Sequence, residues 1–152
     1  MKKLICLILC IFMCVFAVSF EAMAAPDVIG VYDSLGTGGM ITVTNPAKKY
    51  STTYSKSYSI SGFAYAGSNV YVYKYDSAYA AYRPYIENGA FVSGTVGASG
   101  IFVLPVSLNS GKNTFLVRCE KDGVYQNTIF DINVLSASMF SIRNSLNGIK
   151  LR

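Results

Sequence analysis

The sequence contains no histidine and no tryptophan, and charged residues make up only 14% of it. Without histidine, the chain has neither a Ser-His-Asp or Cys-His catalytic arrangement nor a histidine-ligated metal site. The net charge is +5, and the basic residues are scattered along the chain rather than gathered in one stripe. A nucleic-acid-binding surface is therefore not predicted, because such surfaces cluster their lysines and arginines.

Carboxylates and cysteines are also scarce. A glycosidase needs two carboxylates facing one glycosidic bond, and no such pair is visible in the sequence. Cys6, Cys10 and Cys14 lie in the first 24 residues, which we predict below to be a cleaved leader. Cys119 is then left without a partner for an internal disulfide, and we predict that it is a small buried core residue. We therefore predict that the chain is not an enzyme and carries no metal or cofactor. The acidic residues outside 1–24 are Asp27, Asp33, Asp76, Glu87, Glu120, Asp122 and Asp131.

The first 24 residues have the order of a secretory signal peptide. Lys2 and Lys3 form a positive start, residues 4–20 are apolar, and Ala22-Met23-Ala24 supplies the small residues for a cut after Ala24. The apolar stretch is close to the ~20 residues that span a bilayer, so an uncleaved membrane anchor is the alternative. We predict a protein that is secreted or associated with the cell surface, with no membrane span once the leader is removed.

From about residue 40 the chain alternates between apolar and polar residues in short runs, and Gly, Asn, Ser or Asp breaks the pattern about every eight to twelve residues. This pattern predicts one all-β domain over 40–135, an antiparallel sandwich of seven to eight strands. Asp122-Gly123 predicts a tight hairpin turn, whereas the conformation of 76–99 stays open. The predicted strands are 40–44, 58–64, 70–75, 90–95, 101–108, 114–120 and 125–135, with a short edge strand possible around Pro84.

One face of these strands predicts the core. If Val70 and Val72 point inward, the same alternation gathers branched aliphatic and aromatic side chains from the other strands. Cys119 falls on the same alternation as Phe115 and Val117, which supports its prediction as a core residue. The further residues of the predicted core are Ile60, Phe102, Leu104, Val106, Ile132 and Val134.

Several short motifs are specific as a set, although each is weak alone. They are Ile41-Thr42-Val43-Thr44-Asn45-Pro46, Ile60-Ser61-Gly62, Ala66-Gly67-Ser68-Asn69-Val70-Tyr71-Val72, Gly100-Ile101-Phe102, Val106-Ser107-Leu108, Gly111-Lys112-Asn113-Thr114-Phe115 and Asp122-Gly123. Together they resemble a bacterial immunoglobulin-like family, the domain type beside the catalytic part of glucodextranase and in many Gram-positive surface proteins. The resemblance covers roughly 40–135 and implies a two-sheet sandwich that acts as a spacer, stalk or adhesive module without catalysis, in a Gram-positive-like bacterium.

Tyrosine is the most concentrated residue type, with ten of the twelve tyrosines between Tyr50 and Tyr85. If the valines of 70–75 face the core, Tyr71, Tyr73 and Tyr75 form an outward row, with Tyr65 outward on another strand. Such a row suits recognition of a sugar or a protein strand, because a tyrosine ring buries a large area at low entropic cost. The alternative is that these rings pair across strands and that the 76–99 segment covers them.

The two ends of the domain allow several interpretations. Residues 25–39 form an N-terminal segment that could add one strand to its own sheet edge, or to another subunit's, before a flexible Gly-rich hinge at 36–39. In the tail, 136–152, Met139, Ile142, Leu146 and Ile149 recur at helical spacing and predict a short amphipathic helix. This helix could pack on its own sandwich, fray, or dock on a partner or a membrane surface.

These observations predict a secreted, non-catalytic interaction module of the bacterial cell envelope, which binds an unidentified protein partner or self-assembles, so that an oligomer is possible. The alternative is a carbohydrate-binding module that recognises a cell-wall glycan through Tyr65, Tyr71, Tyr73 and Tyr75.

Overall fold

The computed structural model describes residues 25–136. The predicted leader, 1–24, and the predicted helix of the tail lie outside the described residues.

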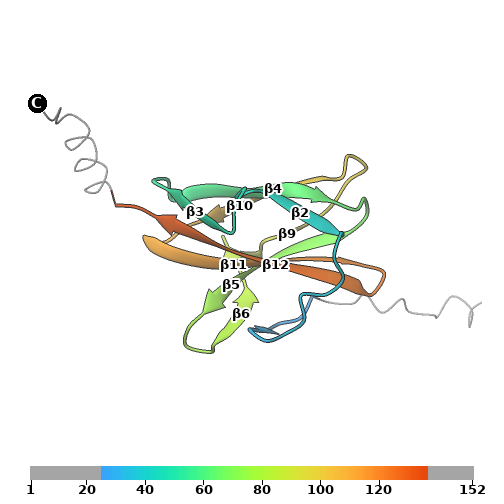
Figure 1. Cartoon of the computed structure of the whole chain (residues 1–152), viewed down its shortest axis with the longest axis horizontal. Coiled ribbons are helices and arrows are strands. Elements are labelled where there is room, and N and C mark those ends of the chain that lie inside the picture. Colours follow the sequence, from blue (N-terminus) through green and yellow to red (C-terminus); the bar gives the residue numbers. More distant parts are fainter. Residues whose placement is uncertain (1–24, 137–152) are drawn as a thin grey trace, which may run out of the picture.

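Two β-sheets stack face to face as the layers of a sandwich (Figure 1). One is seven-stranded, with the order β1-β6-β5-β11-β12-β3 and with β9 also paired to β5, and the other is three-stranded, with the order β10-β4-β2. Strands β7 and β8 form a separate hairpin. Within the described residues the strands are β1 (Ile29–Gly30), β2 (Ile41–Asn45), β3 (Tyr50–Thr53), β4 (Ser57–Ala64), β5 (Asn69–Asp76), β6 (Ala81–Pro84), β7 (Ile86–Glu87), β8 (Ala90–Phe91), β9 (Ser93–Thr95), β10 (Ile101–Ser107), β11 (Gly111–Lys121) and β12 (Val124–Val134).

The consecutive strands β2 and β3 belong to different sheets. β2 pairs antiparallel with β4 in the three-stranded sheet, whereas β3 pairs in parallel with β12 in the seven-stranded sheet. With β5, β11 and β12 side by side opposite β2, β4 and β10, this is the strand arrangement of an immunoglobulin-like sandwich. The predicted all-β fold is confirmed. The described residues hold more strands than the expected seven to eight, because β1, β3 and β7 are added and the predicted strand 90–95 is divided into β8 and β9.

The main core lies between the two sheets and consists of the residues that alternation predicts. Val70, Val72 and Cys119 are fully buried there, and the other predicted members belong to the same cluster. The hairpin between β11 and β12 also follows the prediction: Asp122 and Gly123 both adopt positive φ, at 52° and 76°, which is how a two-residue turn matches the twist of its strands. Local sequence therefore decided the long strands, their inward faces and this turn.

The 76–99 segment forms an interrupted strand beside β5. β6 pairs with one half of β5 and β9 with the other, and between them Tyr85 and Val92 hydrogen-bond to the backbone of Val72. The β7–β8 hairpin is inserted into this strand. Pro84, which has no N–H, lies at the end of β6 beyond the residues that pair with β1, as an edge position requires.

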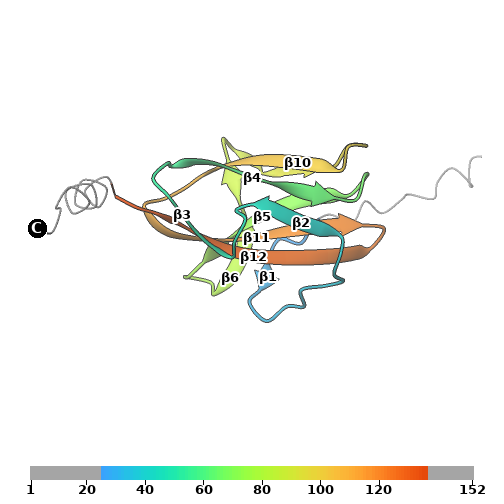
Figure 2. The same cartoon turned by 45° about the horizontal axis from the view of Figure 1, so that its top comes forward.

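The N-terminal segment pairs with its own domain. Ile29 of β1 lies opposite Tyr82 of β6, and the segment runs beneath the seven-stranded sheet (Figure 2). Gly36, the first residue of the expected flexible hinge, is packed against β12. It forms a β-bridge with Gln126, and a Cβ atom added to Gly36 would lie 2.1 Å from the backbone oxygen of Tyr125. Its φ of +77° also favours glycine. The segment is therefore part of the folded domain.

Candidate functional site

The predicted exposed row of tyrosines is not formed. Tyr71, Tyr73 and Tyr75 do point away from the main core, but Tyr73 is 0% exposed and Tyr71 is half-buried. Phe91 of β8 stacks on Tyr71 with ring centroids 5.7 Å apart and meets Tyr73 edge-on at 5.4 Å. The alternative, that the 76–99 segment covers these rings, is the one observed. Only Tyr75, at 36%, keeps substantial exposure in this row.

Tyr73 is the centre of a second, smaller core on the outer face of the seven-stranded sheet. It packs there with Ile29, Tyr82 and Leu116. Its hydroxyl donates a hydrogen bond of 2.9 Å to the backbone oxygen of Pro26, so the ring is anchored to the N-terminal segment. Burial raises the pKa of the Tyr73 phenol far above its ordinary range. This tyrosine is a structural residue and is closed to a large ligand.

The buried tyrosines predict a loss of stability at alkaline pH. Burial raises their pKa values above the ordinary 10.0, so above about pH 10 the unfolded chain loses phenol protons that the folded chain retains, and the free energy of unfolding falls. Lys74, whose pKa burial lowers, contributes in the opposite direction, but it is a single group. We expect urea midpoints to fall between about pH 9 and pH 11, and to fall less in Tyr73→Phe. A urea midpoint that stays constant between about pH 9 and pH 11 would contradict this prediction. The groups with raised pKa values are Tyr58, Tyr71, Tyr73, Tyr82, Tyr85 and the thiol of Cys119.

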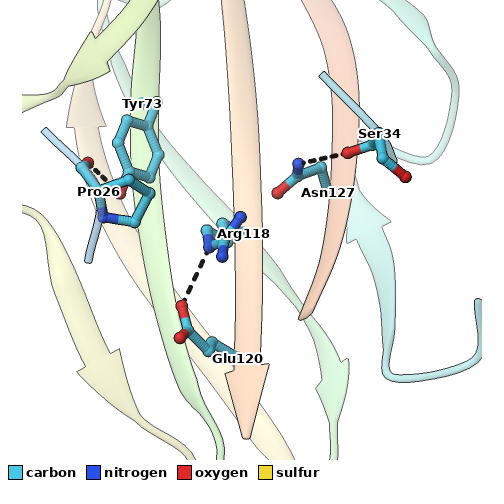
Figure 3. Close-up of polar contacts among 6 residues, drawn as sticks. All are labelled: Pro26, Ser34, Tyr73, Arg118, Glu120 and Asn127. Carbon is cyan, nitrogen blue, oxygen red and sulfur yellow. Dashed lines mark hydrogen bonds and ion pairs between the residues drawn. The ribbon is translucent and has the colours of Figure 1, made fainter. Parts of the chain in front are cut away.

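A buried polar cluster adjoins this second core (Figure 3). Arg118 of β11 is 9% exposed, its Nε donates to Glu120 at 3.0 Å, and its guanidinium carbon lies 3.8 Å from the ring centroid of Tyr125. Asn127 of β12, directly opposite Arg118, donates from Nδ2 to the backbone oxygen of Ser34 at 3.0 Å. The sequence did not reveal this cluster, because polar residues on the outer face of a strand are expected to be solvated.

A cleft of about 770 Å³ lies beside β5 and β6. Its lining is both polar and apolar. Arg83 approaches Asp76 at 3.8 Å, and the Arg83 guanidinium lies 4.7 Å from the ring centroid of Tyr79. Tyr75 is the one predicted binding residue that faces this cleft. The cleft is lined by Asp27, Val28, Lys74, Tyr75, Arg83 and Ile86, among others.

The outer face of the three-stranded sheet has the opposite character. Strands β2, β4 and β10 contain no charged residue, so the charged strand residues of 25–136 all lie in the other sheet or the β7–β8 hairpin. Phe63 and Ile101 face each other across β4 and β10 and are 55% and 52% exposed. Val103 of β10 and Tyr65, which directly follows β4, are 59% and 57% exposed and extend the same patch. We call Phe63, Tyr65, Ile101 and Val103 the neutral patch.

The neutral patch does not continue into an open sheet edge. Pro105 interrupts the outer edge of β10, because it offers no N–H to a further strand. At the end of β10, the Ser107 N–H is bonded to the Tyr85 hydroxyl and to Glu87, and the Ser107 hydroxyl also donates to Glu87. On the β10 side, association is therefore expected through the exposed face of the sheet rather than through its edge.

Neither a search against protein-family models nor a search of the curated proteins finds a match to this chain. Within residues 25–136, no three side chains of His, Cys, Asp or Glu come together in a group that could hold a metal ion. No helix in this same part of the chain is long and apolar enough to cross a membrane.

Proposed function

We propose that the protein is a secreted, non-catalytic interaction module of the bacterial cell envelope, which binds another protein through the neutral patch. The exposed Phe63, Ile101 and Val103 on strands without a single charge, with the exposed Tyr65 directly after β4, carry this proposal. Cores of protein interfaces are depleted of charged residues and enriched in aromatic ones, and a contiguous exposed apolar patch marks an interaction site. The order of residues 1–24 supports export.

The occupant that we propose for the neutral patch is a second copy of the chain. Two neutral patches meet without repulsion between like charges, and a symmetric dimer needs only a surface that complements itself. Three strands of about seven residues present a face of roughly 300–350 Å², well below the ~800 Å² per partner of a stable complex. We therefore expect association to be weak, with a dissociation constant of about 10⁻⁵–10⁻³ M.

Replacing Phe63 with lysine tests this function. The substitution places a charge at the centre of the patch on both copies, so we expect the dimer dissociation constant to rise about tenfold or more. Phe63 is 55% exposed, and the folded monomer should therefore tolerate the change. Sedimentation equilibrium over a wide range of protein concentrations measures the constant.

The matched control is Tyr32→Lys, which also replaces an exposed aromatic ring by a cation, at 99% exposure on the N-terminal segment. This variant should associate as the parent protein does. Self-association is refuted if the parent protein sediments as a monomer at every concentration, or if Phe63→Lys and Tyr32→Lys weaken it equally.

The alternative of sugar binding by an exposed tyrosine row loses its support, since Tyr73 is fully buried and Tyr71 is half-buried beneath Phe91.

A further inference from the structure

Two buried polar groups on the outer face of the seven-stranded sheet have hydrogen-bonding capacity that the described residues do not use. The Arg118 guanidinium has one hydrogen-bond partner among them, Glu120, which accepts from Nε. The Asn127 Oδ1 is buried without any partner in the described part of the chain. Buried polar atoms are normally paired, so the Asn127 Oδ1 calls for a partner, and the Arg118 guanidinium beside it has further N–H groups to donate.

Both groups line one cavity of about 260 Å³, which the N-terminal segment roofs. Arg118 and Asn127 rise from neighbouring positions on β11 and β12, and Asn127 is held in place by its bond to Ser34 (Figure 3). The N-terminal segment contributes three apolar residues to the lining, Pro26, Val28 and Ile29, and two polar ones, Asp33 and Ser34. The cavity therefore combines polar donors and an acceptor on its floor with a roof that is apolar only in part.

The charges of the cavity do not favour an anion. Glu120 already compensates Arg118 at 3.0 Å, and the Asp33 carboxylate, which accepts from the Gly30 N–H at 2.6 Å, adds a negative charge to the lining. The free guanidinium N–H groups need an acceptor, whereas Asn127 Oδ1 needs a donor. A hydroxyl group supplies both at once.

We propose that this cavity binds a single neutral sugar ring, such as the terminal unit of a glycan. Its hydroxyls accept from Arg118 and donate to Asn127, while the C–H face of the ring packs against Pro26, Val28 and Ile29, the apolar part of the roof. The volume, smaller than the ~300–1,000 Å³ typical of sites for drug-sized ligands, limits the occupant to about one ring. Val28 lines both this cavity and the larger cleft that holds Tyr75, so further units of a glycan would extend into that cleft.

The test is a titration of nitrogen-15-labelled protein, residues 25–152, with glucose, galactose, mannose and N-acetylglucosamine. At least one of these sugars should shift the signals of the Asn127 side-chain amide and the Arg118 Nε–H, with saturation at a dissociation constant of about 1–10 mM. Asn127→Ala, which removes the acceptor, should raise this constant about tenfold.

A second variant tests the site without touching its buried groups. Val28 is 54% exposed and lines the cavity, so Val28→Trp should block the cavity and abolish the shifts while the fold is kept. Val31→Trp is the control, because Val31 is 40% exposed on the same segment and does not line the cavity.

Three outcomes would overturn the proposal. They are the absence of shifts with all four sugars, shifts with phosphate or glucuronate but not with a neutral sugar, and unchanged binding in Val28→Trp. None of them bears on self-association through the neutral patch, which lies on the other sheet and is measured without sugar.

Discussion

Replacing Tyr73 with alanine should lower the free energy of unfolding by about 3–5 kcal/mol. The ring is 0% exposed and packs with Ile29, Tyr82 and Leu116, so truncation removes a large buried apolar surface and leaves a cavity. It also breaks the hydrogen bond to Pro26 that ties the N-terminal segment to the sheet. Chemical denaturation monitored by circular dichroism measures the change.

Two other tyrosine variants separate the contributions. Tyr73→Phe keeps the ring and removes only the bond to Pro26, so it should cost about 0.5–1.5 kcal/mol. Tyr65→Ala changes a ring that is 57% exposed on the other sheet and should alter stability by less than about 0.5 kcal/mol. If Tyr73→Ala unfolded at the same denaturant concentration as Tyr65→Ala, the second core would contribute no stability.

Replacing Glu120 with alanine should destabilise the protein by about 3–5 kcal/mol, because it leaves the Arg118 charge buried without its partner. The side chains of the pair are only 10% and 9% exposed, and the Nε–Oε2 distance is 3.0 Å. The cation–π contact with Tyr125 offsets only part of this loss.

A double variant shows whether the lost charge compensation is the cause. Arg118→Met combined with Glu120→Leu replaces the ion pair by apolar groups of similar volume, and such replacements are neutral or stabilising in other proteins. We expect the double variant to be within about 1 kcal/mol of the parent protein, and hence more stable than Glu120→Ala. A double variant as unstable as the single one would show that packing, rather than the uncompensated charge, dominates.

The two sheets present different outer faces. On the seven-stranded sheet, the N-terminal segment and Phe91 cover aromatic and polar side chains, and this face is mainly a source of stability with one small cavity. On the three-stranded sheet, Phe63, Ile101 and Val103 are left exposed with no segment above them among the described residues. We therefore expect variants of the covered face to change stability and variants of the neutral patch to change association.

Alternation along the chain by itself determined the long strands, the inward direction of Val70 and Val72, the burial of Cys119 and the turn at Asp122-Gly123. These features depend on residues close in sequence, because side chains of a strand alternate between its two sides and a tight turn requires positive φ. The candidate site was predicted only in part: Tyr75 and Tyr65 are exposed as expected, but Tyr73 is not.

The tertiary structure alone decided which outward-facing residues are covered. Alternation shows on which side of a strand Tyr73 and Asn127 lie, but not what packs above them. Tyr73 bonds to Pro26 from 47 residues away and Asn127 to Ser34 from 93 residues away, so their burial arises from non-local contacts. For the same physical reason, the sequence does not reveal that Arg118 and Asn127 lie beneath the N-terminal segment and form the floor of a cavity.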